Sequence, residues 1–154
     1  KNGKGLNLRV SKIYSDGYKN HSSNNSHSLN LSGGIFRDKS IWKLSVLAGN
    51  QKNGLAWMSV PENDINCSKN TNANSEFEDD DFTQIQTKIN NTFLINRNNS
   101  IKSTIYYTFA DGWWNFDLDN YYGLESDGSN LTKNEINSGM LGFFSNYEYL
   151  AKNL

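Results

Sequence analysis

The stretch Gln84-Ile-Gln-Thr-Lys-Ile-Asn-Asn-Thr-Phe-Leu-Ile95 decides the fold class of this chain. Alternate positions within it are mostly apolar: Ile85, Thr87, Ile89, Phe93 and Ile95. The positions between them are polar: Gln84, Gln86, Lys88, Asn90 and Thr92. Because successive side chains of a β-strand point to opposite faces, this alternation predicts a strand with one apolar face and one polar face.

Five further segments alternate in the same way. They are residues 6–11, 28–35, 42–49, 101–109 and 141–149. The sequence therefore predicts an all-β protein, an antiparallel up-and-down meander of about six strands. The only helical element that we expect is a short turn within a loop, around residues 132–137.

Short and long connections between these strands alternate along the chain. Residues 37–40 and 96–100 form short links, whereas the connections across 14–28, 60–82 and 114–138 are long. Loops beyond roughly 12–15 residues are uncommon in compact domains. Short turns at one end and long loops at the other are typical of outer-membrane barrels, so we expect the meander to be part of a larger transmembrane β-barrel.

The composition excludes several classes of protein. The chain has 154 residues, 36% of them hydrophobic and 13% aromatic, and a net charge of −1. A disordered chain would be poor in aromatic residues, and the scattered Lys and Arg residues do not form the basic stripe of a nucleic-acid-binding protein. The mean hydropathy of −0.73 is compatible with a barrel, because only every second residue of its strands meets lipid.

The aromatic and basic residues fit barrel geometry. If the short turns are periplasmic, Phe36, Trp42 and Phe93 fall near the periplasmic rim. Other aromatics fall at or above the outer rim: Tyr14, Tyr18, Trp57, Trp113, Trp114 and Phe116. Aromatic belts at both interfaces are expected of such barrels. Four basic residues avoid the apolar face and are predicted to line the lumen wall: Arg9, Lys43, Lys88 and Lys102.

Three motifs resemble a known family. They are Ser11-Lys-Ile-Tyr-Ser-Asp-Gly-Tyr18, Ala56-Trp-Met-Ser-Val-Pro-Glu62, and Asp111-Gly-Trp-Trp114 followed by Tyr121-Tyr-Gly-Leu124. Their order and spacing resemble the barrel strands of TonB-dependent outer-membrane receptors, over about residues 6–124. The resemblance implies a 22-stranded barrel with an N-terminal plug, located in the outer membrane of a Gram-negative bacterium.

The resemblance also implies a function. Such receptors import scarce, large solutes such as iron–siderophores, haem or cobalamin, with energy delivered by TonB. Residues 1–154 are then expected to be a partial barrel domain, with the plug, the TonB box and the remaining strands outside this chain. Its partners would be the plug, TonB, membrane lipid and the solute, and it would use no cofactor of its own.

Trp57, Trp113 and Trp114 are the candidate ligand-binding residues, because aromatic rings at strand tips can stack on an incoming solute. Anchoring at the membrane interface is the alternative role for these rings. The lumen-facing basic residues would pair with carboxylates of the plug, shape the passage or simply be solvated.

Neither a metal site nor catalysis is predicted. The acidic residues from Glu76 to Asp81 lack the spaced ligands of an EF-hand loop and are expected at a solvated loop tip. His21 and His27 are expected in one loop without further ligands, and Cys67 is expected to be an incidental thiol in a loop. No catalytic motif occurs, so the chain is not expected to be an enzyme.

Two alternative functions remain open. One is a secreted β-sandwich that binds carbohydrate through Trp57, Trp113 and Trp114. A sandwich, however, packs two sheets face to face and needs more apolar positions on their inner sides than this chain supplies. The other is a passive porin-type barrel, or a glycan importer of similar architecture.

Overall fold

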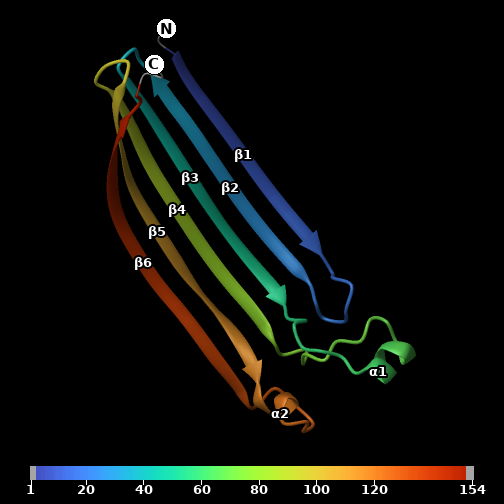
Figure 1. Ribbon diagram of the computed structural model, residues 1–154. Coiled ribbons are helices and arrows are strands. Elements are labelled where there is room, and N and C mark those ends of the chain that lie inside the picture. Colours follow the sequence, from blue (N-terminus) through green and yellow to red (C-terminus); the bar gives the residue numbers. More distant parts are fainter. Residues whose placement is uncertain (1–2, 152–154) are drawn as a thin grey trace.

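The computed structural model describes residues 3–151, which form one antiparallel sheet with the strand order β1-β2-β3-β4-β5-β6 (Figure 1). The strands are β1 (Gly3–Ser15), β2 (Asn24–Phe36), β3 (Ser40–Gly54), β4 (Asp79–Leu94), β5 (Asn99–Asp117) and β6 (Leu131–Tyr149). The predicted all-β meander of six strands is confirmed. The parts of the expected 1–154 domain at residues 1–2 and 152–154 lie outside the described residues.

The connections separate by length, as predicted. The short turns at 37–39 and 95–98 lie at the end of the sheet where the described chain begins and ends, here called the turn end (Figure 1). The longer connections at 16–23, 55–78 and 118–130 lie together at the other end, here called the loop end. Two short helices lie within them, α1 (Glu62–Cys67) and α2 (Leu118–Tyr121).

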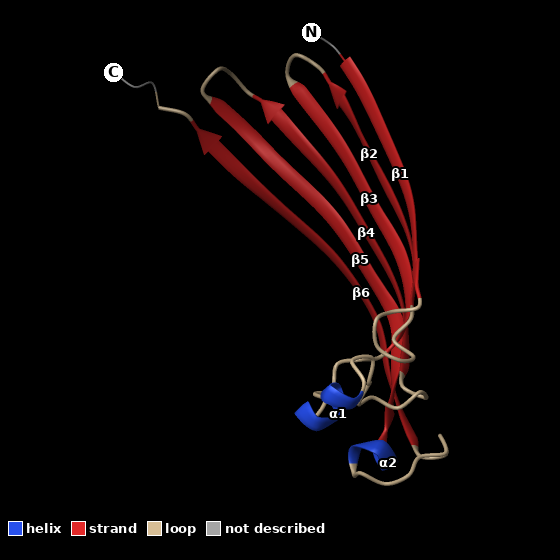
Figure 2. Ribbon diagram, turned by 90° about the vertical axis from the view of Figure 1, so that its right-hand side faces the viewer, coloured by secondary structure: helices blue, strands red, loops and turns tan. Residues whose placement is uncertain are grey.

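The sheet is a single curved layer (Figure 2). Each strand pairs with its neighbour in sequence, and β1 and β6 are the two edges of the sheet. Within residues 3–151 these edges do not meet, so the sheet does not close into a barrel.

The strands extend further toward the loop end than the sequence predicted. β6 begins at Leu131, so residues 132–137 belong to a strand and the expected helical turn there is wrong. β4 begins at Asp79 and β5 continues to Asp117. These strand ends carry no regular apolar alternation; pairing with a neighbouring strand, such as Asp117 with Leu131, keeps them in the sheet.

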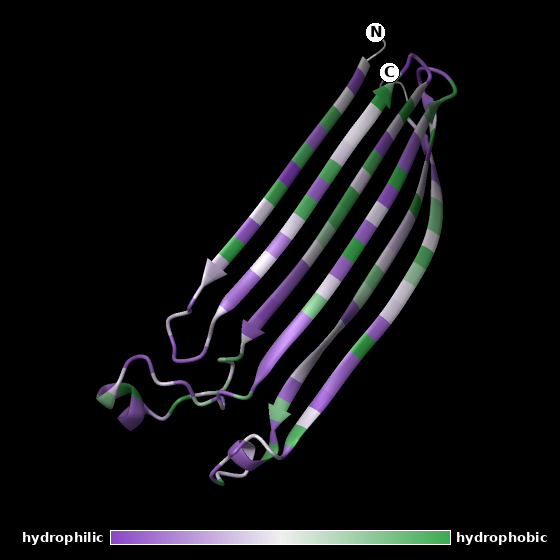
Figure 3. Ribbon diagram, turned by 180° about the vertical axis from the view of Figure 1, so that it is seen from behind, coloured by the Kyte–Doolittle hydropathy of each residue, from purple (hydrophilic) through white to green (hydrophobic). Residues whose placement is uncertain are grey.

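The register places most of the apolar residues of the six strands on one side, called here the apolar face. Directly paired residues share a face, and the pairs Leu8↔Leu31 and Leu44↔Ile89 are examples. The residues between them form the polar face. Coloured by hydropathy, the strands show this alternation as stripes (Figure 3).

No hydrophobic residue is buried within residues 3–151. The buried residues are all polar or charged: Asn74, Glu78, Thr104 and Asp117. A soluble domain is normally built from layers that enclose one hydrophobic core, and this sheet has no second layer over either face.

Candidate functional site

The apolar face is exposed along the middle of the sheet. Its central cross-strand rows are Leu6-Gly33-Leu44-Ile89-Ile105-Phe143, Leu8-Leu31-Val46-Thr87-Tyr107-Leu141 and Val10-Leu29-Ala48-Ile85-Phe109-Gly139. No charged residue occurs in these rows. Leu8, Ile105 and Phe143 are 60%, 50% and 67% exposed, respectively. A contiguous exposed apolar patch of this kind marks a surface that contacts another protein or a membrane.

A row of polar residues ends the apolar band at the loop end. The register brings together Lys12, His27, Asn50, Thr83, Asp111 and Asn137, one from each strand. The band therefore ends at the same level on all six strands, which single-strand alternation did not reveal.

Four polar side chains inside the band toward the turn end bond in two pairs, and Lys4 lies on the same face in the row of Ile35 and Trp42. Asn91 Nδ2 donates to Ser40 Oγ at 3.1 Å. The hydroxyl oxygens of Ser103 and Ser145 lie 2.9 Å apart. Such pairing lowers the free-energy cost of placing these groups in an apolar medium.

The polar face carries the four basic residues that the sequence assigned to it. Lys102 Nζ lies 2.6 Å from Glu148 Oε1, and Arg9 Nε donates to Ser11 Oγ at 3.2 Å. Lys43 and Lys88 pair with Asn90 and Tyr106 in the register. Their ammonium groups have no side-chain partner among residues 3–151.

The structure does not bring the three predicted tryptophans together. Trp113 lies on the apolar face beyond the polar row, with Lys133 Nζ 5.2 Å from its ring centroid. Trp114 lies on the polar face and stacks on Phe82 at 6.2 Å between centroids.

Trp57 belongs to a separate aromatic cluster at the loop end. Its ring stacks on Phe116 at 6.1 Å, and Phe116 meets Tyr121 at 5.3 Å. Since Trp57 and Tyr121 are largely exposed, this cluster offers ring faces to solvent independently of Trp114.

The acidic run is not a solvated loop tip. Asp79, Asp80 and Asp81 open β4, and each accepts a hydrogen bond from an asparagine side chain. The donors are Asn115 at 2.8 Å, Asn53 at 2.7 Å and Asn50 at 2.8 Å, respectively. The sequence could not show these donors, because they lie on the two neighbouring strands.

Glu78 is the centre of a buried polar cluster that joins the loop 55–78 to the end of β5. It is 1% exposed and accepts from the Asp117 backbone N–H at 3.0 Å and from Asn74 Nδ2. Asn74 also accepts from the Met58 backbone N–H at 2.8 Å through its Oδ1. Every buried side-chain nitrogen or oxygen of the described residues has a partner, so this cluster holds the loops in one arrangement.

Asp117 completes the cluster from the side of α2. Its Oδ2 accepts from Ser126 Oγ at 2.6 Å, and its Oδ1 accepts from the Asn120 backbone N–H at 3.2 Å. Burial acts to raise the pKa of the Asp117 carboxyl, but the hydrogen bonds outweigh burial and the pKa is lowered. The ionised carboxylate is therefore the form that these donors stabilise.

The two histidines and the cysteine that the sequence analysis considered lie apart from one another. His27 lies in β2 and not in a loop, whereas His21 lies in the loop 16–23 with its Nε2 3.0 Å from the Asn74 backbone oxygen. Cys67 ends α1 and is exposed. Within residues 3–151, no group of three or more His, Cys, Asp or Glu side chains is placed to hold a metal ion.

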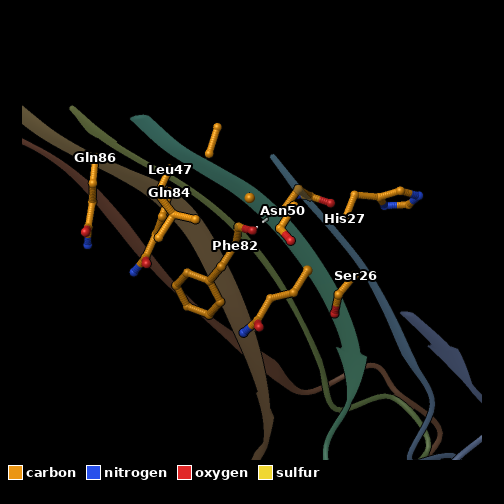
Figure 4. Close-up of a pocket in the computed structure, with 11 residues that line it drawn as sticks. Ser26, His27, Leu47, Asn50, Phe82, Gln84 and Gln86 are labelled. Atoms are coloured by element: carbon orange, nitrogen blue, oxygen red, sulfur yellow. Dashed lines mark hydrogen bonds between the residues drawn. The ribbon is translucent and has the colours of Figure 1, made fainter. Parts of the chain in front are cut away.

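A groove of about 460 Å³ lies on the polar face near the loop end (Figure 4). The register arranges its polar-face lining as a grid over three strands: Ser26 and Ser28 from β2, Gln51, Gly49 and Leu47 from β3, and Phe82, Gln84 and Gln86 from β4. In Figure 4 the side chains of Phe82, Gln84 and Gln86 point to one side of the sheet, and His27 points to the other.

Sequence reasoning missed this groove. Gln84 and Gln86 were assigned to a polar face, but Gln51 joins them only through the pairing of β3 with β4. One signal was available: the chain contains three glutamines, and all three line this groove.

Charge is divided between the two ends of the sheet. Every acidic residue except Asp38 and Glu148 lies at the polar row of the apolar face or beyond it, toward the loops. The turn end is mainly basic, with Lys4, Arg37, Lys39 and Arg97. The loop end therefore presents a negative field to an approaching solute.

The helices of residues 3–151 include none that is long and apolar enough to span a membrane. No family model, curated protein or solved structure matches this chain.

Proposed function

We propose that this chain is a wall segment of an outer-membrane β-barrel of the TonB-dependent transporter type. The strands form part of the wall, with the apolar face toward lipid and the polar face toward the lumen. The loops 16–23, 55–78 and 118–130 contribute to an external vestibule that captures a scarce, large solute. The chain performs no covalent chemistry, and the energy for uptake comes from TonB.

The observation that carries the proposal is the exposed apolar band, whose three central rows carry no charge, without a buried core among the described residues. Along β4 the band runs from Ile85 to Phe93, about 26 Å at about 3.3 Å per residue. Along β6 it runs from Gly139 to Tyr149, about 33 Å by the same measure. A strand tilt of about 40° reduces these lengths to about 20 and 25 Å across the membrane, compared with an apolar band about 25 Å tall in known barrels.

The loops support the same orientation. Long loops face outward and short turns face the periplasm in outer-membrane barrels, and the two kinds of connection lie at opposite ends of this sheet. The edges β1 and β6 are where further strands would continue the wall. A sandwich is less well supported, because the described residues form one sheet and not two.

Quenching by brominated lipid tests which face meets the membrane. Two single-tryptophan variants of the full chain would be refolded into vesicles of dibrominated phosphatidylcholine. One keeps Trp42, on the apolar face, and the other keeps Trp114, on the polar face beyond the band. We expect strong quenching of Trp42, by at least half, and little quenching of Trp114.

Vesicles of the same lipid without bromine serve as the control for both variants. Equal quenching of the two tryptophans would contradict the two-faced wall. A chain that remains a folded monomer in buffer, without binding the vesicles, would contradict the membrane proposal altogether.

A further inference from the structure

We propose that the groove centred on Gly49 is a binding site for a neutral carbohydrate, lying on the lumen face just below the loops. This inference rests on the proposed function in one respect, since it takes the polar face as the path of the solute. It assigns a polyhydroxylated solute in place of the metal-chelate solutes that the family resemblance implies.

The side chains of the groove are free to bind a ligand. Gln51, Gln84 and Gln86 form no side-chain hydrogen bond within residues 3–151, and all three residues are exposed. A glutamine amide both donates and accepts hydrogen bonds. Three such groups therefore match the hydroxyl groups of a sugar, each of which also donates and accepts.

Two apolar surfaces lie among these amides. Leu47 is 44% exposed although it lies on the polar face. The ring of Phe82 lies against Gly112, where an added Cβ would come within 2.4 Å of the ring. Phe82 also stacks on Trp114, so its position is fixed. A sugar ring has C–H groups that pack on such surfaces while its hydroxyls reach the amides.

The floor of the groove is backbone. Gly49 stands at the centre of the grid, directly paired with Ser28 on one side and Gln84 on the other. A glycine inside a strand weakens the strand and often marks a place where a ligand approaches the backbone closely. Here the missing side chain opens the space between the flanking residues Leu47 and Gln51.

The groove favours a carbohydrate over a peptide. Peptides that bind sheets commonly add a strand at an exposed edge, through backbone hydrogen bonds. β2, β3 and β4 are interior strands whose backbone groups are already paired. Recognition in this groove must therefore come from side chains, which suits a ligand that carries many hydroxyl groups.

Charge favours a neutral ligand. The residues that line the groove include no acidic side chain, no lysine and no arginine. The loop end through which a solute would pass is acidic and repels anions. A ferric chelate with net negative charge fits neither feature.

Isothermal titration calorimetry of the full chain in detergent micelles tests the proposal. The probes are maltohexaose, cellohexaose and mannohexaose, with hexagalacturonate as the anionic comparison and a Gly-Ser hexapeptide as the peptide comparison. We expect saturable binding of at least one neutral hexasaccharide. Gly49→Val should weaken that binding at least tenfold, because the added side chain fills the floor. The double variant Gln84→Leu/Gln86→Leu should do the same by removing hydrogen bonds.

Thr87→Val is the matched control, since Thr87 directly follows Gln86 in β4 but lies on the other face. We expect unchanged affinity in this variant. Valine suits a strand, but a Cβ at Gly49 would lie 3.3 Å from the His27 backbone oxygen, a tight contact that requires a shift of a few tenths of an ångström. Circular dichroism would check that each variant keeps the sheet.

Three outcomes would overturn the carbohydrate site: no binding of any neutral hexasaccharide, binding that the groove variants leave unchanged, or tighter binding of the peptide or of hexagalacturonate. These outcomes are separate from failure of the wall proposal. Quenching of Trp42 by brominated lipid reports on the apolar face alone. Sugar binding by a chain that does not enter lipid would support the groove and contradict the membrane role.

Discussion

The sheet and the loop end differ in which kind of side chain is exposed and which kind is buried. In the sheet, the large apolar side chains are exposed on one face, and nothing in the described chain covers them. At the loop end, the buried residues are polar, and Glu78, Asn74 and Asp117 satisfy one another and the nearby backbone. The loops are thus held by their own hydrogen bonds, whereas the apolar face is exposed and, in the proposed wall, would be covered by lipid.

This difference gives the two regions different roles in the proposed wall: the sheet faces lipid, and the loop end holds side chains in a fixed arrangement. The charge-free central rows of the face would tolerate lipid, because only their side chains would meet the hydrocarbon while their backbone groups are paired within the sheet. Buried polar networks fix one geometry when every member is satisfied. The loop end can therefore present the Trp57 cluster and the mouth of the groove in a defined arrangement.

The largest effect is expected from a charge inside the apolar band. Ile89→Lys places an ammonium group in a central row of the apolar face. At the middle of a membrane, this should lower the free energy of unfolding by about 2–4 kcal/mol. Urea unfolding in phospholipid vesicles, followed by tryptophan fluorescence, measures it. Met140→Lys, on the polar face of β6 and 52% exposed, should change stability by only about 0.5 kcal/mol; equal losses would remove the distinction between the faces.

An intermediate effect is expected at the loop end. Glu78→Ala leaves the Asp117 backbone N–H and the Asn74 amide without their acceptor. Buried donors left unpaired cost about 1–3 kcal/mol. Hydrogen exchange of residues 72–78 should therefore become faster, while the amides at the centre of the sheet remain protected. Glu76→Ala is the matched control because Glu76 is exposed; the two variants behaving alike would argue against the buried cluster.

The smallest effect is expected from pH. The lowered pKa of Asp117 means that its ionised form stabilises the loop end above the unfolded pKa, about 3.9 for aspartate. That stabilisation is lost as the pH falls through the lowered folded value. Opening of residues 118–126, measured by hydrogen exchange corrected for intrinsic rates, should rise as the pH drops below about 4. Asp117→Asn should reduce this dependence, and an unchanged profile would contradict the assignment to Asp117.

Local sequence rules predicted the middle of each strand correctly. Leu44, Val46 and Ala48 share a face because strand periodicity is a property of the backbone, independent of its partners. The same rules failed at the strand ends. Trp113 and Trp114 were treated as one binding group, although adjacent residues of a strand must point to opposite faces. The error followed from ending that strand at Phe109, whereas β5 continues to Asp117.

Long-range register decided what the local rules could not. His27 joined a polar row and Asp81 found its asparagine donor only after β2, β3 and β4 were aligned. The cluster around Glu78 joins a loop to the end of a strand 39 residues further along. Hydrogen bonds between such distant segments leave no periodic trace in the sequence.

The sequence by itself determined the all-β class, the order of the strands along the chain, the apolar and polar sides of each strand, and the alternation of short and long connections. Each of these depends on residues within a few positions of one another. Only the tertiary structure decided the common level at which the apolar band ends, the buried polar cluster of the loops and the groove around Gly49. Each of these depends on which residues lie opposite one another on neighbouring strands, because a shift of one residue in register moves every side chain to the other face.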